Sequence, residues 1–167
     1  MKERDNFLEF KELFSMQKEL DAFIENNRDI NRDVFIEKGL SLTIELAELA
    51  NETRCFKYWS SKGPSERNIL LEEFVDSIHF LLSLGNEKGF TLDEWPIIHE
   101  EVDLTRCFLK TQKEILSFIH SPEVDKYRMV WQNYSVLAYN LGFSIEDVLS
   151  AYKIKNEKNY ERQRTGY

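Results

Sequence analysis

The chain has 167 residues, the length of one ordinary domain, and its composition excludes several classes of protein. Hydrophobic residues make up 42% of it, and six glycines and three prolines are far fewer than a disordered, collagen-like or turn-rich β protein carries. Two cysteines are too few for a disulfide scaffold or a thiolate metal site, so a reducing, cytoplasmic location is expected. The net charge of -8 argues against nucleic acid as a partner, and no apolar run approaches the ~18 residues of a membrane span.

The first part of the chain predicts two helices. Apolar residues at helical spacing mark a helix over residues 7–24, and Gln17 falls within their stripe. A second helix begins near residue 31 or 33 and runs toward residue 58. Its apolar residues lie on nearly every side, which predicts a central position in the fold.

The middle of the chain predicts two more helices. A polar loop separates the second helix from the third, which has Ser65 as a candidate N-cap and ends near Gly85 or Gly89. Residues 91–94 have the spacing of a capping box, and Pro96 permits a fresh helix start. The helix that begins there is expected to run to about residue 120.

Two helices are predicted for the remainder. A new helix is predicted to begin with Ser121 as its N-cap and the following proline as its first residue. This helix is expected to end at Gly142. Ser144 caps the last helix, from residue 145 to about 164. No run of strand period appears, so the expected fold is all-α, one domain over residues 1–167 with about six or seven helices.

The charge of the chain is unevenly distributed. Residues 153–167 hold five bases and two acids, a local charge of +3, so the net charge of -8 leaves -11 for the rest. An acidic body with a basic tail suits a metal-bound polyanion. We expect this tail to be mobile without a ligand.

Two acidic pairs stand on consecutive predicted helices, Glu45 with Glu48 and Glu73 with Asp76. The i, i+3 spacing places each pair on one helical face, with Cβ atoms roughly 5–6 Å apart. The short loop between the helices predicts an antiparallel hairpin, which would bring the two pairs together. A single acidic pair of this kind usually lies on a solvated face, but two pairs on separate apolar helices make that alternative less attractive.

These carboxylates are separated by apolar residues, so their helices offer little solvated face. An unpaired buried carboxylate costs several kcal/mol, and few bases lie nearby in the sequence. Four convergent oxygen ligands suit Mg²⁺, with Mn²⁺ as a substitute.

The same residues carry a family resemblance. The acidic pairs resemble the metal signature of the all-α nucleotide pyrophosphohydrolases, which include MazG-like enzymes. Three blocks, together with Met16–Leu20, are similar to the dimeric all-α dUTPases: Glu45–Trp59, Leu71–Gly85, and Ala151–Gln163 with the terminal Gly166–Tyr167. The resemblance implies Mg²⁺-dependent hydrolysis of dUTP to dUMP and pyrophosphate by a homodimer, with dUDP as a further candidate substrate.

The resemblance also implies roles for the charged residues. Glu45, Glu48, Glu73 and Asp76 would bind the metal, and Glu48 would also orient and deprotonate the attacking water. Three polar residues recur at i, i+4 and i+7 and would bind the phosphates: Lys155, Asn159 and Arg162. The alternative for these three is a solvated last turn.

Recognition of the base is expected at Gln17, because its amide both donates and accepts, as the pairing edge of uracil requires. A core glutamine bonded to backbone is the alternative. One turn later, where the family has an asparagine, this chain has Asp21, which cannot donate when ionised.

Four further residues are implied at the substrate: Phe80 stacks on the base, Trp59 closes the pocket, Lys57 lies near the phosphates, and His79 contacts the sugar or supports a metal ligand. Core packing is the alternative for the two aromatic residues, and a structural role is the alternative for His79.

Two other functions remain open from the sequence. A related pyrophosphohydrolase would prefer another base, as a dCTPase or a MazG-like enzyme does. A non-enzymatic helical module would use its acidic helices to bind a basic partner.

Overall fold

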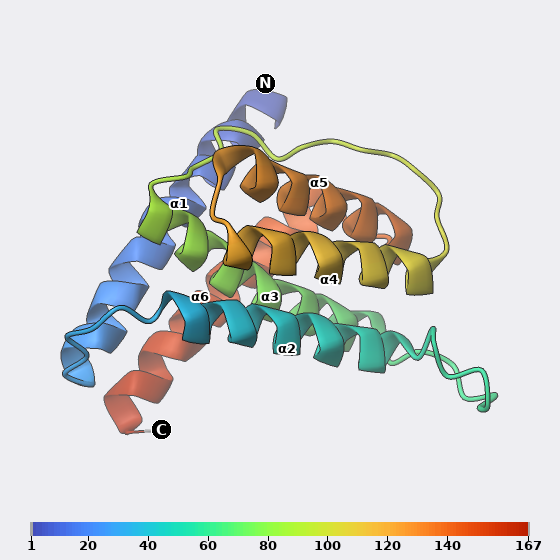
Figure 1. Ribbon diagram of the computed structural model, residues 1–167, viewed down its shortest axis with the longest axis horizontal. Coiled ribbons are helices and arrows are strands. Elements are labelled where there is room, and N and C mark those ends of the chain that lie inside the picture. Colours follow the sequence, from blue (N-terminus) through green and yellow to red (C-terminus); the bar gives the residue numbers. More distant parts are fainter. Residues whose placement is uncertain (1, 167) are drawn as a thin grey trace.

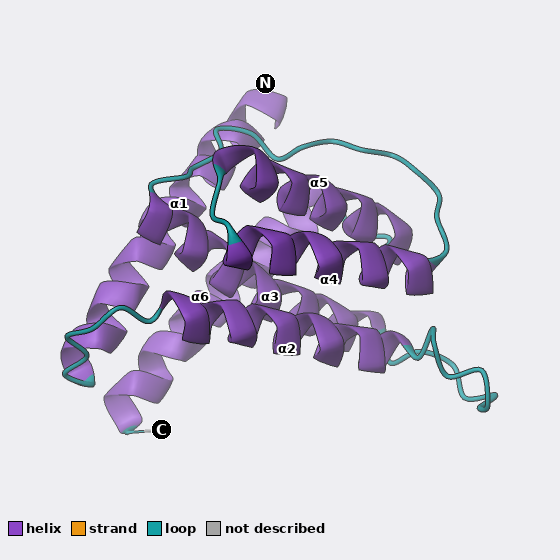
Figure 2. Ribbon diagram, viewed as in Figure 1, coloured by secondary structure: helices purple, strands orange, loops and turns teal. Residues whose placement is uncertain are grey.

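The computed structural model describes residues 2–166, and their side chains from residue 9 onward. Within that range the chain forms six α-helices and no strand (Figures 1 and 2). Their bounds are α1 Lys2–Asn27, α2 Phe35–Thr53, α3 Arg67–Lys88, α4 Leu104–His120, α5 Val124–Leu141 and α6 Ile145–Thr165. The prediction of an all-α fold is confirmed. Phe7, expected at the start of the first stripe, and Tyr167 lie outside the described side chains.

The helices pack as neighbouring pairs (Figure 1). α2 and α3 run antiparallel and make the most extensive contact in the fold, as the loop between them predicted. α4 packs on α5 and on α2, and α6 packs on both α1 and α3. Residues from α1, α2, α3 and α6 therefore surround one region, which contains the candidate site.

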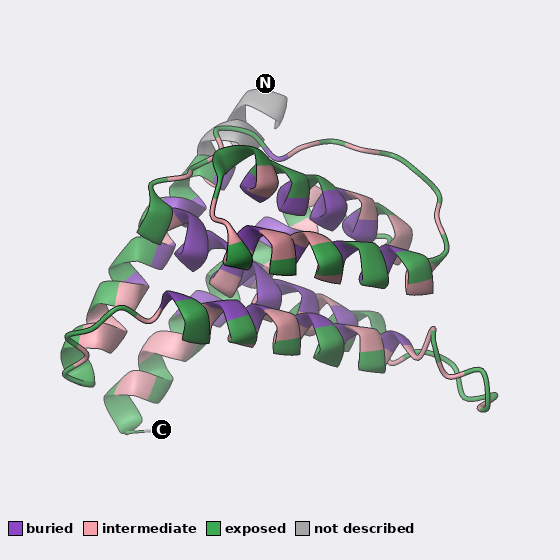
Figure 3. Ribbon diagram, viewed as in Figure 1, coloured by how far each residue is buried: buried purple, intermediate pink, exposed green. Residues whose placement is uncertain are grey.

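Aromatic rings fill the core between α1 and α5. Phe10, Trp95 and Trp131 contact one another edge to face, with ring centroids 5.3 to 5.7 Å apart. Such contacts add about 0.5–1.5 kcal/mol per pair to the free energy of burial. Figure 3 shows the buried residues on the inward faces of the helices.

Of the two glycines predicted near the end of α3, Gly89 marks the end, which confirms the prediction, and Gly85 lies inside the helix. A Cβ at this position would lie 2.1 Å from the Tyr127 hydroxyl, so only glycine permits the approach of α5. The helix ends three residues later, with Gly89 as its left-handed C-cap at φ 70°.

The prediction of a helix that starts near Pro96 is wrong, because residues 91–103 are not helical. This segment crosses the molecule as an extended connection (Figures 1 and 2). Side chains of α5 satisfy its backbone: Ser135 Oγ accepts from the Ile98 N–H at 3.1 Å, and Asn140 Oδ1 accepts from the Val102 N–H at 3.0 Å. These bonds replace the helical ones that Pro96 would have started, and α4 begins after Asp103, which caps it.

Other helix boundaries also differ from the prediction. α2 ends at Thr53 rather than near residue 58, because Arg54 adopts a left-handed conformation with φ 58°. Neither predicted serine caps a helix at residues 65 and 121: the Ser65 hydroxyl bonds to Glu52, and Ser121 ends α4. The Ser144 cap of α6 is confirmed, as part of a capping box with Asp147.

No helix among the described residues is both long enough and apolar enough to cross a membrane.

Candidate metal and nucleotide site

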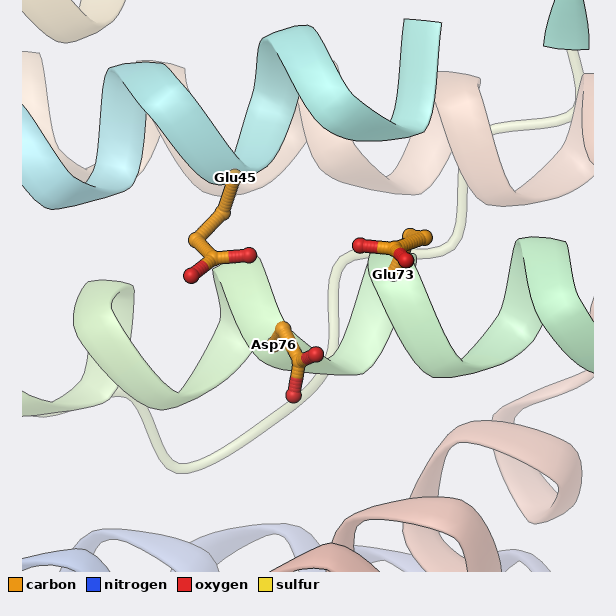
Figure 4. Close-up of side chains that lie close together, drawn as sticks. All are labelled: Glu45, Glu73 and Asp76. Atoms are coloured by element: carbon orange, nitrogen blue, oxygen red, sulfur yellow. The ribbon is translucent and has the colours of Figure 1, made fainter. Parts of the chain in front are cut away.

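Three of the predicted ligands converge between α2 and α3 (Figure 4). Glu45 comes from α2, and Glu73 and Asp76 lie one turn apart on α3. Each offers a carboxylate oxygen within 4.8 Å of the others. The i, i+3 spacing on α3 and the antiparallel packing of α2 therefore bring together three of the four ligands that the sequence predicted.

The cluster is electrostatically strained. Burial and the neighbouring charges of Asp76, Glu48 and Glu73 raise the pKa of Glu45 to about 7. The pKa values of Glu73 and Asp76 are also raised, mainly by burial. Like charges at this separation favour the protonated form unless a cation compensates them.

Lys155 of α6 supplies part of that compensation. Its Nζ lies 2.8 Å from Asp76 Oδ2 and 3.1 Å from Glu72 Oε1, and the residue is only 7% exposed. Lys155 is shared between Asp76 and Glu72. Among the described residues, Glu45 and Glu73 form no ion pair of this kind. Burial is the main cause of the raised pKa of Glu45, followed by the charges of its acidic neighbours, which Lys155 only partly offsets.

Glu48 lies beside the cluster rather than within it. It is exposed one turn after Glu45, and no oxygen of Glu48 belongs to the group of three. Its charge nevertheless raises the pKa values of both Glu45 and Glu73, so it acts on the same site. Glu52, a further turn along α2, accepts a hydrogen bond from Ser65 and also raises the pKa of Glu73.

A cavity of about 350 Å³ opens next to the carboxylates. Residues from α1, α2, α3 and α6 line it, together with two residues of the loop before α2. Nine of its lining residues were singled out from the sequence: Gln17, Asp21, Glu45, Asp76, His79, Phe80, Lys155, Asn159 and Arg162. The structure thus brings the candidate base-binding, phosphate-binding and metal-binding groups to one site.

Gln17 lies within a network of side chains. Its Oε1 accepts from the Tyr152 hydroxyl at 2.9 Å and from His79 Nδ1 at 2.7 Å, and its Nε2 donates to Asp21 Oδ1 at 2.8 Å. The alternative of a core glutamine bonded to backbone is therefore wrong, since all three partners are side chains.

His79 is a neutral acceptor at this cavity. Burial, and to a lesser extent the charge of Lys155, lowers its pKa to about 3. Since the Gln17 oxygen can only accept, the proton of the ring must be on Nδ1. His79 Nε2 is then a bare acceptor, and it is buried without a protein partner. The ring stacks on Tyr152 with centroids 4.2 Å apart.

The structure does not bring Lys57 and Trp59 to this cavity. Both follow the end of α2, in a loop that projects beyond the helices (Figure 1). Trp59 is 65% exposed and packs edge to face on Tyr58, while Lys57 lies over the ring of Phe56.

Two residues that contact the predicted base-binding residues were not predicted from the sequence, Lys38 and Tyr152. Lys38 lies 4.0 Å from Asp21 and 3.4 Å from Glu25, and it also pairs with Glu87. Its place two turns before Glu45 on the same helical face was a usable signal. The second is Tyr152, whose bond to Gln17 spans 135 residues and leaves no local trace in the sequence.

The sequence matches one family model, described as dUTPase, over residues 9–167. No curated protein matches the chain. The family implies a nucleotide substrate and a divalent metal cofactor, in agreement with the cavity and the carboxylate cluster. The chain therefore belongs to the all-α dUTPase family and is a dUTP diphosphatase.

Proposed function

We propose that Glu45, Glu73 and Asp76, joined by Glu48, hold the Mg²⁺ with which this protein hydrolyses dUTP to dUMP and pyrophosphate. The observation that carries the proposal is the convergence of three carboxylates with raised pKa values beside a cavity lined by cationic and amide side chains. A group of hard oxygen donors with excess negative charge fits Mg²⁺ better than it fits a softer metal. Mn²⁺ would fit the same ligands.

When bound, the metal would neutralise charge on the phosphates and lower the pKa of a bound water. The residues of the chain perform the remaining tasks. Glu48 is the proposed base that takes the proton of the attacking water, because it is exposed yet close enough to shift the pKa values of two cluster residues. A free carboxylate outside the group of three is available for that role.

We assign the phosphates to one face of α6. Lys155, Asn159 and Arg162 follow one another at i, i+4 and i+7, and all three line the cavity. Lys155 is already fixed by Asp76, so it links the phosphate end of the cavity to the metal ligands. Phosphate oxygens bound to such donors form charge-assisted hydrogen bonds, which are roughly twice as strong as neutral ones.

We assign the base to the part of the cavity lined by Gln17, His79 and Phe80. Phe80 is half-buried and supplies an aromatic face for stacking. His79 Nε2 supplies a buried acceptor for a hydroxyl or amide of the nucleoside. For Lys57 and Trp59, contact with substrate stays a prediction.

A panel of nucleoside triphosphates tests this function. Chelator-treated protein should release pyrophosphate from dUTP in a single step after Mg²⁺ is restored, and more slowly from dCTP and from ribonucleotides. Mn²⁺ should replace Mg²⁺, and dUDP is assayed in the same series. Orthophosphate and dUDP as first products, or turnover that persists in excess chelator, would contradict the proposal.

We also propose a homodimer that forms through the exposed side of α2 and α4. Ile36, Leu40 and Ile44 lie at i, i+4 and i+8 on α2 and are 50–65% exposed. Leu109 and Leu116 of α4 are similarly exposed, and an apolar groove of about 220 Å³ lies between the two helices. Exposed apolar residues beside an apolar groove are typical of interfaces between subunits.

Both cysteines are free, in agreement with the proposed reducing, cytoplasmic location.

A further inference from the structure

Lys155 stands between two hollows of the surface. From α6 it lines the cavity beside the carboxylate cluster, and it also lines a smaller groove of about 130 Å³ between α3 and α6. Its Nζ lies 2.8 Å from Asp76 Oδ2 and 3.1 Å from Glu72 Oε1. Because an ammonium group has three hydrogens, these two contacts leave one hydrogen for a ligand.

The two carboxylates that hold Lys155 differ in what else they can contact. Glu72 and Asp76 lie one turn apart on the same face of α3. Asp76 belongs to the group of three carboxylates and lines the cavity. Glu72 does neither, because it lies in the smaller groove, where its side chain is 47% exposed. A ligand in the cavity therefore meets Asp76 directly, but it acts on Glu72 only through Lys155.

A cation at the carboxylate cluster would change the contacts of Lys155. Asp76 is one of the proposed metal ligands, so a divalent cation held there would lie close to the ammonium and repel it. Lys155 is only 7% exposed, and a buried charge without an opposite partner is costly. Glu72 is the partner that remains, because it stands outside the cluster.

We propose that Glu72 is a positioning residue, which holds Lys155 beside the phosphates of the substrate when a metal ion takes over Asp76. The inference rests on the proposed location of the metal and of the phosphates. Before metal binds, the ammonium compensates the charge of Asp76. Afterwards it stays bonded to Glu72 and gives its remaining hydrogens to phosphate oxygens. Lys155 thus exchanges a carboxylate for a phosphate without leaving its place on α6.

This arrangement makes Lys155 a competitor of the metal for Asp76. Glu72 weakens the competition, because it draws the ammonium toward itself. Without the charge of Glu72, Lys155 should pair fully with Asp76 and compete more strongly. The effect needs Lys155: a Glu72 that bound the metal, or acted on it only through its charge, would keep its effect after Lys155 had been removed.

Calorimetric titration with Mn²⁺ alone tests this in four proteins: wild type, Glu72→Gln, Lys155→Met and the double variant. In about 0.15 M salt, which screens distant charges, Lys155→Met should bind Mn²⁺ roughly three- to tenfold more tightly than wild type. Glu72→Gln should bind it more weakly by a similar factor. In the Lys155→Met background, the loss caused by Glu72→Gln should shrink to within about twofold. An equal loss in both backgrounds overturns the proposal.

Inorganic pyrophosphate with Mg²⁺ tests the phosphate part of the cavity without turnover. Glu72→Gln should weaken its binding roughly three- to tenfold, and should raise KM for dUTP more than it lowers kcat. Lys158→Gln is the matched control. Lys158 Nζ lies 3.6 Å from the same oxygen of Glu72, but Lys158 does not line the cavity, so its variant should bind pyrophosphate within about twofold of wild type.

The outcomes separate this inference from the proposed function. Thermal unfolding shows which variants fold, and Lys155→Gln takes the place of Lys155→Met if the methionine variant does not. If Mn²⁺ and pyrophosphate binding follow the expected pattern but dUTP is not hydrolysed, the proposed function fails and the role of Glu72 stands. If dUTP is hydrolysed and Glu72→Gln binds both ligands like wild type, the role of Glu72 is overturned and the proposed function stands.

Discussion

Glu45 differs from an ordinary helical glutamate in its surroundings. It is half-buried, it faces Glu73 and Asp76, and Lys155 is shared by other carboxylates. The chain thus keeps a carboxylate with a pKa of about 7 on a helix that an apolar residue would stabilise. A carboxylate with a strongly raised pKa is typical of a functional site that binds a ligand.

This pKa predicts how stability depends on pH in the absence of metal. The carboxyl of Glu45 has an ordinary pKa of 4.5 in the unfolded chain and about 7 in the folded one, so the folded state binds more protons between these values. Its contribution to the free energy of unfolding is therefore lost as pH rises from about 4.5 to 7. Denaturant unfolding in chelator should show the wild type losing stability relative to Glu45→Gln over this range.

Addition of Mg²⁺ at neutral pH should stabilise the wild type more than the Glu45→Gln variant, since a cation that binds the ionised cluster favours the folded state. A difference between the two proteins that stays constant across the pH range would show that Glu45 is not strained by its neighbours.

At the residue scale, the sequence predicted which residues lie in the site better than it predicted their hydrogen-bond partners. The spacing of Glu45, Glu73 and Asp76 was sufficient to predict that they converge, because helix geometry and one hairpin set their positions. It could not predict that Tyr152 and His79 both use the Gln17 oxygen, since those contacts depend on how α3 and α6 pack against α1.

At the scale of elements, α6 joins the basic tail to the site. Residues 153–165 continue α6 as a helix, with Tyr160 packed on Phe23 of α1 and Gln163 accepting from Arg28. Because of their i, i+4 and i+7 spacing on this helix, Lys155, Asn159 and Arg162 all line the same cavity. Mobility of the tail before substrate binds stays a prediction, for which protease protection by dUTP and Mg²⁺ is the measurement.

Two arginines of α6 allow a test of whether the face of this helix that lines the cavity binds the phosphates. Arg162 lines the cavity, whereas Arg164 does not and pairs with Glu157 at 3.2 Å. Arg162→Ala should weaken productive dUTP binding by about one to two decades in kcat/KM, because a charge-assisted contact to phosphate is lost. Arg164→Ala should stay within about twofold of wild type, and thermal unfolding should confirm that both variants fold. Equal losses in the two variants would contradict the assignment.

The error over residues 91–103 arises at this scale too. Thr91 and Pro96 are residues that often begin a helix. The segment is instead held in an extended conformation by hydrogen bonds to Ser135 and Asn140 of α5 and by the burial of Trp95. Tertiary hydrogen bonds replaced local ones, and no local pattern in the segment reveals them.

At the scale of the whole molecule, the apolar face of α2 and α4 predicts self-association. Leu40→Glu places a charge at the centre of that face and should convert a dimer to a monomer in sedimentation equilibrium, because an uncompensated charge in an apolar interface is costly. Ile154→Glu is the matched control, since Ile154 of α6 is 62% exposed and Leu40 is 63% exposed. A wild type that sediments as a monomer, or a dimer unaffected by Leu40→Glu, would contradict the proposed interface.

The central claim is that the three carboxylates of α2 and α3 hold the catalytic metal. Calorimetric titration of Mg²⁺ or Mn²⁺ into chelator-treated protein tests it most directly, with Glu45→Gln as the variant and Glu37→Gln, an exposed residue of the same helix, as the control. We expect wild type and Glu37→Gln to bind the metal alike, and Glu45→Gln to lose at least tenfold in affinity because a ligand charge is removed. Equal affinity in all three proteins, or no binding to the wild type, would contradict the claim.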